Sequence, residues 1–281
     1  MSADDQCDAG AYEAGAGSNL VLLHGLGGTW SVWKPVLMAL SSRHRVIAMT
    51  LPGHEGGRVL PPGAEPTIAI LADDLIAQLR QRGVMSAHVV GNSLGGWLAL
   101  ELGRRGFAKS VVAFSPAGAW STPKDYAEIS RSFRILFALM PLIIVLTSAF
   151  LRFAAVRRLL SRATMEHGDR IPAGEMRAMF RALRRTYILP ALLKTMGRDG
   201  PIAPLDAGRT PIRIVWGGSD RTIPFERYGR PMMERVAAAE GVTLPGAGHV
   251  PMYDDPQGVA DAILAVTANA DAGQSSGAAA C

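Results

Sequence analysis

The chain is 281 residues long, 48% of its residues are hydrophobic, and its formal net charge is +5. This length suits one α/β domain with an insertion, and the hydrophobic content supports a large core. The two cysteines, Cys7 and Cys281, lie near the chain ends, which excludes a disulfide framework and a cysteine metal site. The N-terminal sequence Ser2–Gln6 is acidic and polar rather than a secretory signal, so we expect a cytoplasmic location.

The first strong strand signal is the apolar run Asn19–Leu23, which continues into the glycine-rich sequence His24–Gly28. Glycine lets backbone N–H groups come close to a ligand oxygen, and an oxyanion hole needs such preorganised donors. We therefore assign the N–H of Leu26 to an oxyanion hole. His24 is interpreted as a residue that fixes this loop and not as a second base.

Strands and helices alternate through most of the chain, which predicts a mostly parallel sheet flanked by helices. Strands are predicted over residues 20–24, 44–50, 87–92, 109–114, 211–216 and 241–245. Helices are predicted over residues 31–41, 67–82, 94–105, 226–238 and 256–268. The runs Arg45–Met49 and Ser110–Phe114 are almost continuously apolar, as expected of buried parallel strands.

The most informative stretch is residues 91–95, Gly-Asn-Ser-Leu-Gly, which lies between an apolar strand and a helix. Gly-x-Ser-x-Gly in that context predicts a nucleophile elbow, a tight turn that lifts the hydroxyl of Ser93 clear of the sheet. Strand and helix pass close together there, so small residues such as Gly91 and Gly95 are needed on either side. The helix N-terminus favours developing negative charge, and the N–H of Leu94 is assigned as the second oxyanion donor.

The alternation of strands and helices stops between Ser115 and Leu205, where Arg, Leu, Met and Phe become common. This segment is predicted to be a helical cap over the carboxyl end of the sheet, where open α/β folds bind ligands. The predicted organisation is a core of residues 1–116 and 206–268, a cap of residues 117–205, and a flexible tail of residues 269–281.

The cap carries all of the excess positive charge. Residues 117–205 hold 14 Lys and Arg against 6 Asp and Glu, a balance of +8, and the rest of the chain holds 15 against 18. A basic surface can attract nucleic acid, an anionic membrane or acidic substrates. Nucleic acid is not expected as a partner, because the chain has no binding motif and no interleaved basic and aromatic residues. A solvated helix face is the simplest interpretation.

Residues 135–151 form a run of 17 residues without a charge. A bilayer span needs about 20 apolar residues, and Pro141 interrupts the run. We therefore predict no transmembrane span, and interpret the run as a buried cap helix that lines a hydrophobic pocket. A lid that contacts a lipid interface is the alternative. The predicted pocket residues are Trp120, Leu142, Ile144 and Val250.

Two late loops supply the partners that a serine nucleophile requires. A serine hydroxyl needs a base, and the base needs an orienting acid. Asp220 follows the strand Pro211–Trp216, and His249 lies in a loop rich in glycine and proline before the last helix. Each alone could be an ordinary loop residue, but all three in the order Ser93, Asp220, His249 and after strands predict a catalytic triad.

Together these motifs resemble those of the α/β-hydrolase superfamily, in its serine-nucleophile form with a helical cap. The resemblance spans residues 20–265 and rests on His24–Gly28, Leu51–Gly56, the Ser93 elbow, Gly217–Asp220 and Gly248–Pro251. It implies an α/β-hydrolase fold. The elbow sequence is similar to that of carbon–carbon bond hydrolases of aromatic ring-cleavage pathways, although many esterases share it. Family members that open epoxides or remove halogens carry an aspartate nucleophile, and Ser93 argues against both.

The chain departs from the family pattern in two places. The usual opening β-hairpin is expected to be short or absent, because only 19 residues precede Leu20. Thr50 stands where family members often carry an aspartate before the Leu-Pro-Gly-His segment. Neither departure touches the predicted triad.

The expected activity is hydrolysis of esters of lipophilic carboxylic acids through an acyl-enzyme on Ser93, with no cofactor and no metal. Efficiency is expected to rise from acetate to at least butyrate or hexanoate esters, because each buried methylene adds up to about 0.8 kcal/mol. One alternative is a carbon–carbon bond hydrolase whose basic cap holds a carboxylate. The other is a non-catalytic ligand-binding member of the fold.

Overall fold

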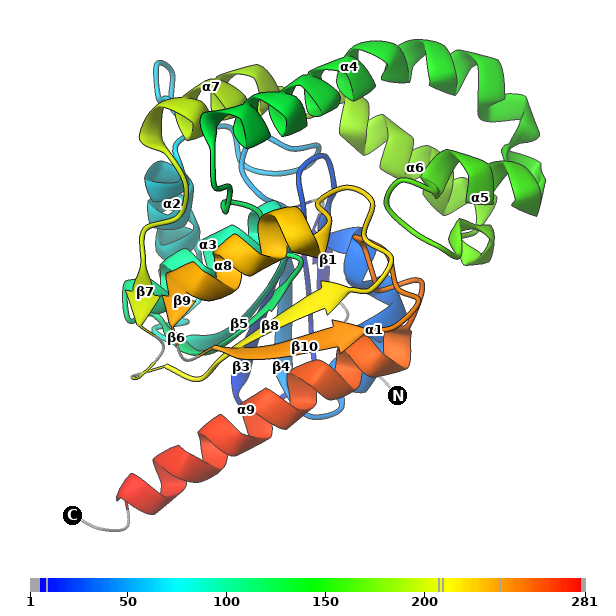
Figure 1. Cartoon of the computed structure of the whole chain (residues 1–281). Coiled ribbons are helices and arrows are strands. Elements are labelled where there is room, and N and C mark those ends of the chain that lie inside the picture. Colours follow the sequence, from blue (N-terminus) through cyan, green and yellow to red (C-terminus); the bar gives the residue numbers. More distant parts are fainter. Residues whose placement is uncertain (1–5, 9, 207, 209, 238, 279–281) are drawn as a thin grey trace.

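The computed structural model describes residues 6–8, 10–206, 208, 210–237 and 239–278. An eight-stranded sheet is built from these residues, in the order β1-β2-β4-β3-β5-β6-β8-β10 (Figure 1). The six strands from β4 to β10 are parallel, and β1 and β2 are antiparallel at one edge. The predicted α/β-hydrolase fold is confirmed. The strands are β1 (Gln6–Asp8), β2 (Ala11–Ala14), β3 (Asn19–Leu23), β4 (Arg45–Met49), β5 (Ala87–Asn92), β6 (Ala108–Phe114), β8 (Ile212–Gly217) and β10 (Glu240–Leu244).

The opening hairpin is present but short, with strands of three and four residues. Thr50 helps to fasten it to the sheet. Its backbone N–H donates to the carbonyl of Gly10 at 2.8 Å, and its hydroxyl accepts from the N–H of Trp30 at 3.3 Å. A threonine at this position therefore joins the hairpin turn to the loop after β3.

Both faces of the sheet are buried, which explains why its parallel strands are apolar at almost every position. In β3, Val21 and Leu23 belong to the core cluster that includes helices α2 (Ile68–Gln81) and α3 (Leu94–Arg104). Leu20 and Leu22 belong to the opposite cluster, with α1 (Lys34–Ser41) and α9 (Pro256–Ala278). Alternate residues thus face opposite layers.

Two predicted helices differ at their ends. The helix predicted over residues 226–238 is an α-helix only in α8 (Arg230–Arg235), after a π-helical turn over Phe225–Gly229. The next two residues pair as β9 (Val236–Ala237) with β7 (Leu205–Asp206), so long-range pairing ends the helix.

The C-terminal helix continues where a flexible tail was predicted. α9 runs from Pro256 to Ala278, and residues 279–281 lie outside the described residues. Alanine-rich sequence favours helix, and the carboxylate of Asp271 accepts hydrogen bonds from the hydroxyl of Ser18 at 2.9 Å and from Nε2 of His88 at 3.1 Å. These contacts fasten α9 to the sheet at Asp271, and in Figure 1 the last turns of the helix extend beyond the strands.

The regular elements described between β6 and β7 are helical. They are α4 (Pro123–Thr147), α5 (Ala154–Ser161), α6 (Ala173–Arg184) and α7 (Leu189–Asp199), with 3₁₀ turns over Ser148–Arg152 and Gly168–Arg170. In Figure 1, α7 and the first half of α4 lie across the top of the molecule, and the second half of α4 extends with α5 and α6 beyond the sheet. We call this extension the arm, residues 135–184.

Helix α4 is not the buried helix that its uncharged run predicted. The segment Pro123–Arg152 is long and apolar enough to cross a membrane by length and composition, yet only 11% of its most apolar window is buried. Leu142, Val145 and Leu146 are more than half exposed. A run of apolar residues has the same sequence signature whether it faces a core or the outside of the protein, so the pattern alone could not decide.

Candidate active site

Ser93 occupies the turn between β5 and α3 in a strained backbone conformation, with φ 55° and ψ −115°. Such a positive φ costs a non-glycine residue about 1–3 kcal/mol. A Cβ added to Gly91 would lie 2.0 Å from the carbonyl oxygen of Gly95, and one added to Gly95 would lie 2.2 Å from that of Leu23. The two glycines are therefore required, and the geometry is that of a nucleophile elbow.

Asp220 and His249 form a buried pair. The Nδ1 atom of His249 lies 2.8 Å from Oδ2 of Asp220, and the other carboxylate oxygen accepts from the N–H groups of Thr222 and Ile223, each at 2.9 Å. Burial raises the pKa of Asp220, but attraction and hydrogen bonding to His249 and the N–H of Ile223 outweigh it and hold that pKa below its ordinary value. The ionised carboxylate can therefore keep the proton of His249 on Nδ1, which leaves Nε2 free to act as a base.

Ser93 and His249 line the same large cavity, so the structure brings all three predicted triad residues into one site. Within the described residues, the hydroxyl of Ser93 makes no hydrogen bond to His249. In enzymes without substrate, such hydrogen bonds are often long and tighten only in the substrate complex.

The loop after β3 passes directly over the serine. A Cβ added to Gly25 would lie 3.1 Å from the Cβ of Ser93. Leu26 lines the same cavity walls as Ser93 and Leu94, and Leu94 is the first residue of α3, where helix N–H groups lack intrahelical acceptors. Neither the N–H of Leu26 nor that of Leu94 donates a hydrogen bond among the described residues. Both are available to an oxyanion.

His24 has no free ring nitrogen with which to act as a second base. Its Nε2 accepts from the N–H of Leu51 at 2.9 Å, so the proton is on Nδ1, which donates to the carbonyl of Gly25 at 2.7 Å. The ring of His54 lies 4.9 Å away, edge to face. Burial, reinforced by His54, lowers the pKa of His24 well below its ordinary value, and burial lowers the pKa of His54 to about 4. Both rings are neutral at pH 7.

These buried histidines should make the protein less stable in mild acid. Because the folded pKa of His54 lies below that of the unfolded chain, the unfolded state binds more protons between about pH 6.5 and 4, and stability falls as pH falls through that window. We expect His54→Asn, whose amide can still donate to Pro52, to reduce the loss between pH 7 and pH 5 by about 2 kcal/mol. Urea unfolding at the two pH values measures this, and an unchanged pH dependence would contradict it.

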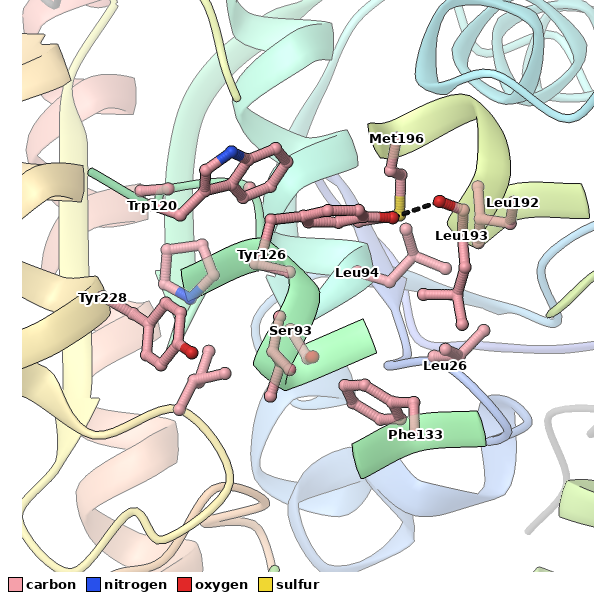
Figure 2. A pocket seen from close by; sticks show the side chains of 16 residues that line it. Leu26, Ser93, Leu94, Trp120, Tyr126, Phe133, Leu192, Leu193, Met196 and Tyr228 are labelled. Carbon is pink, nitrogen blue, oxygen red and sulfur yellow. Dashed lines mark hydrogen bonds between the residues drawn. The ribbon is translucent and has the colours of Figure 1, made fainter. Parts of the chain in front are cut away.

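Two cavities meet at Ser93. The larger has a volume of about 430 Å³ and is lined by Ser93, His249 and mostly apolar cap residues. The smaller has a volume of about 50 Å³, does not include His249, and is apolar. Figure 2 shows the smaller cavity, with Ser93 on one side and Trp120, Tyr126 and Met196 on the other. The hydroxyl of Tyr126 donates a hydrogen bond to the carbonyl of Leu193.

The predicted pocket residues are only partly brought to the site. Trp120 lines the small cavity and Val250 the large one. Leu142 is 57% exposed and lines neither cavity, and Ile144 is half-buried against the cluster that includes the cap residues Met140 and Leu151, and lines neither cavity. These two predictions are wrong because α4 leaves the cavity after Met140 and continues into the arm. The described residues that α4 gives to the large cavity are Ile129, Ser132, Phe133, Leu136, Phe137 and Met140.

Sequence reasoning missed two side chains that hold the His249 loop. The amide of Asn92 donates to the carbonyl of His249 at 2.8 Å and to that of Phe114 at 3.1 Å. The carboxylate of Asp254 accepts from the N–H of Gly248 at 2.8 Å. Asn92 lay inside the elbow motif, but its partner is 157 residues away, and a single polar residue in a motif gives no signal for a contact of that range.

A short cap segment, residues 161–167, crosses both loops that carry the acid and the base. We call it the strap. Its carbonyl at Thr164 accepts from the N–H of Val250 at 2.9 Å, and its carbonyl at Ala163 accepts from the hydroxyl of Thr222 at 2.9 Å. Asp254 also accepts from the strap, from the N–H of His167 at 2.7 Å. The strap therefore fixes the Asp220 and His249 loops relative to each other.

One cluster far from Ser93 has the residue types of a metal site. Ligand atoms of His44, His88 and Asp271 lie within 4.8 Å of one another at the amino ends of the strands. All four ring nitrogens, however, have hydrogen-bond partners, which are Ser18, Thr267, Ser110 and Asp271. This arrangement is a hydrogen-bonded network that joins α9 to the sheet.

Comparison with known proteins gives consistent matches. The sequence profile described as the Alpha/beta hydrolase family matches residues 20–262. Epoxide hydrolase EphH of Mycobacterium tuberculosis is 31% identical over 208 residues, which cover 69% of this chain and 92% of that protein. The pimeloyl-[acyl-carrier protein] methyl ester esterase of Aeromonas hydrophila is 28% identical over 261 residues, covering 86% and 92%. A thermophilic esterase of Thermogutta terrifontis has a similar structure, with a TM-score of 0.71 at 20% identity, over 92% of this chain and 93% of that one.

Proposed function

Because this chain belongs to the alpha/beta hydrolase family and is a hydrolase of that type, we propose that it is a serine carboxylesterase. The observation that carries the proposal is the placement of Ser93 at a strained elbow, in one cavity with a His249 that is oriented by a buried Asp220. No cofactor or metal is required for the reaction proposed.

The proposed reaction has two halves, formation and hydrolysis of an acyl-enzyme, and the same catalytic groups act in both. His249 takes the proton of Ser93 as the serine oxygen attacks the ester carbonyl, and Asp220 stabilises the charged imidazole. The N–H groups of Leu26 and Leu94 bind the oxyanion that develops. His249 then donates its proton to the alcohol oxygen, which leaves. Water, deprotonated by His249, attacks the acyl-enzyme, and His249 returns this proton to the oxygen of Ser93 as the acid leaves.

The two cavities assign the two halves of the ester. His249 must reach the oxygen of the leaving alcohol, and it lines the large cavity but not the small one. The alcohol therefore belongs in the large cavity and the acyl group in the small one. A 150 Å³ cavity holds benzene, so about 50 Å³ holds roughly two carbon atoms. The proposed substrates are acetyl or propionyl esters of a bulky apolar alcohol, instead of the long acyl chains expected from sequence.

One relative is named as an epoxide hydrolase, so epoxide opening is an alternative activity to consider. The chemistry of a serine nucleophile disfavours it here. A carboxylate that opens an epoxide forms an ester, which water can cleave at its carbonyl. A serine that opens an epoxide would form an ether, which has no carbonyl, so the enzyme would be trapped after one turnover. Ser93 thus supports the ester reaction.

The carbon–carbon hydrolase alternative needs a cationic group that holds a carboxylate in the cavity. Among the described residues that line the large cavity, Arg221 is the one arginine, and it already pairs with Glu166. No arginine of the cap is among the described residues that line this cavity, and two of them, Arg181 and Arg185, pair with Glu55. The basic charge of the cap is therefore not directed at the substrate, and an uncharged ester fits the cavity better.

A screen of four substrate classes tests the proposal. Short-acyl aryl esters, long-acyl aryl esters, an aryl epoxide and a dienol-carboxylate ring-cleavage product would be assayed with the same enzyme preparation. Turnover of the short-acyl esters is expected. Turnover of the epoxide or ring-cleavage product alone would overturn the ester assignment, and binding without turnover in every class would favour the non-catalytic alternative.

Enlarging the small cavity should change which acyl groups are accepted. Met196 lines only this cavity, and Met196→Ala removes three heavy atoms. We expect the acyl chain with the highest kcat/KM to become longer by as many as about three carbons. Each additional methylene that is buried should raise kcat/KM by up to about fourfold. The matched control is Met179→Ala, in the large cavity, which should leave acyl preference unchanged. A kcat/KM series from acetate to hexanoate measures both, and equal shifts in the two variants would contradict the assignment.

A further inference from the structure

The outer half of α4 and the turn after it present an exposed apolar surface. We define the arm patch as the exposed residues at the outer end of α4 and in the following turn: Leu139, Leu142, Val145, Leu146, Phe150 and Phe153. Val145 and Leu146 are 71% and 62% exposed. In Figure 1 this part of α4 lies at the edge of the molecule, farthest from the sheet. Contiguous apolar surface of this kind marks an interaction site.

The chain segment that carries the patch holds charge of one sign. Residues 129–165 contain six arginines and neither aspartate nor glutamate. Arg131 and Arg134 precede the patch on α4, and the guanidinium of Arg152 lies 4.7 Å from the centre of the Phe153 ring. Within the described residues these three arginines make no salt bridge. Their charges are available to an outside partner.

We propose that the arm patch docks the enzyme onto an anionic lipid bilayer. Apolar side chains surrounded by unpaired arginines match a membrane interface, where side chains enter the headgroup layer and cations meet lipid phosphates. The patch is also continuous with the site, because Leu136 and Met140, on the same helix, line the large cavity. A lipophilic substrate could therefore pass from the bilayer to the cavity without crossing water.

The geometry favours docking on the surface over a helix that spans the bilayer. The first half of α4 is part of the site: Tyr126 bonds to the carbonyl of Leu193, and Phe133 lines both cavities. This half cannot enter a bilayer without dismantling the cavity beside Ser93. Only the outer half is free to contact lipid.

Vesicle sedimentation with the Ser93→Ala protein tests the proposal without any hydrolysis, so its outcome does not depend on the proposed esterase activity. Binding is expected to vesicles of phosphatidylcholine mixed with phosphatidylglycerol, to weaken as NaCl rises, and to be much weaker with phosphatidylcholine alone. Replacing Arg131, Arg134 and Arg152 together by glutamine should weaken binding about a hundredfold, at about fivefold for each arginine.

The apolar contribution is tested by Val145→Glu/Leu146→Glu, which should weaken binding at least about tenfold. The control is Met38→Glu/Met85→Glu, which places the same charges at methionines that are 85% and 68% exposed outside the cap. Equal binding by these two double variants, or no binding of the parent protein to anionic vesicles, would overturn the proposal. The proposal would also be wrong if the protein formed a dimer without lipid and only Val145→Glu/Leu146→Glu dissociated that dimer. A second copy of the chain would then cover the patch.

Discussion

Ser93→Ala is expected to lower kcat/KM for a short-acyl aryl ester by about 10⁴-fold or more, because no other group can form the acyl-enzyme. The fold should survive, since the hydroxyl makes no hydrogen bond among the described residues and the elbow backbone is unchanged. His249→Ala should be about as damaging, because nucleophile and base act as a unit. Initial rates and thermal unfolding of the variants measure the two effects separately.

A matched serine distinguishes a nucleophile from a serine that merely lines the cavity. Ser132 lines the large cavity from α4, and its hydroxyl donates to the carbonyl of Glu128 at 3.0 Å. Ser132→Ala should keep most of the activity. If Ser93→Ala kept a tenth of the wild-type rate, the assignment of Ser93 as nucleophile would be wrong.

Asp220→Asn is expected to lower turnover by about 10²- to 10⁴-fold. The surrounding donors explain why. The N–H groups of Thr222 and Ile223 will hold the amide oxygen, so the amide NH₂ must face Nδ1 of His249. The ring must then carry its proton on Nε2, where it cannot accept the proton of Ser93.

Asp255→Asn is the control for the acid. Asp255 accepts from the N–H of Gly258 at the start of α9, a capping role that asparagine also fills. Activity should therefore be retained. Steady-state rates of both variants test whether Asp220 orients His249. Full activity in Asp220→Asn would show that another carboxylate has this role. Asp254, which holds the same loop, would then be examined next.

The parts of the fold that could be predicted are those with local signals. The parallel strands are apolar at nearly every position, and each predicted triad residue follows a strand, so the common direction of the strands brings the loops together. Ser93, Asp220 and His249 could be placed in one site for this reason. The proposed oxyanion donors, the N–H groups of Leu26 and Leu94, are predicted from the glycine-rich loop and from the start of a helix.

The features that could not be predicted depend on long-range packing. Leu142 belongs to an uncharged run that reads the same whether it is buried or exposed. Asn92 and Asp254 hold the His249 loop through partners that no short pattern identifies. The small cavity is lined by side chains from separate helices, such as Phe133 of α4 and Met196 of α7, which only tertiary packing brings together. Binary patterning carries no information about such meetings.

The strap limits how freely the cap of this protein could be exchanged for another. All three proposed triad residues lie outside the cap, which suggests that an insertion could be exchanged or deleted at will. Yet the carbonyls of Ala163 and Thr164 bridge the loops that carry Asp220 and His249. A cap transplanted from another hydrolase of this fold would have to bring equivalent acceptors to the same two loops. In this protein, cavity shape and the alignment of the two loops are therefore coupled through one seven-residue segment, which lines the large cavity and holds both loops.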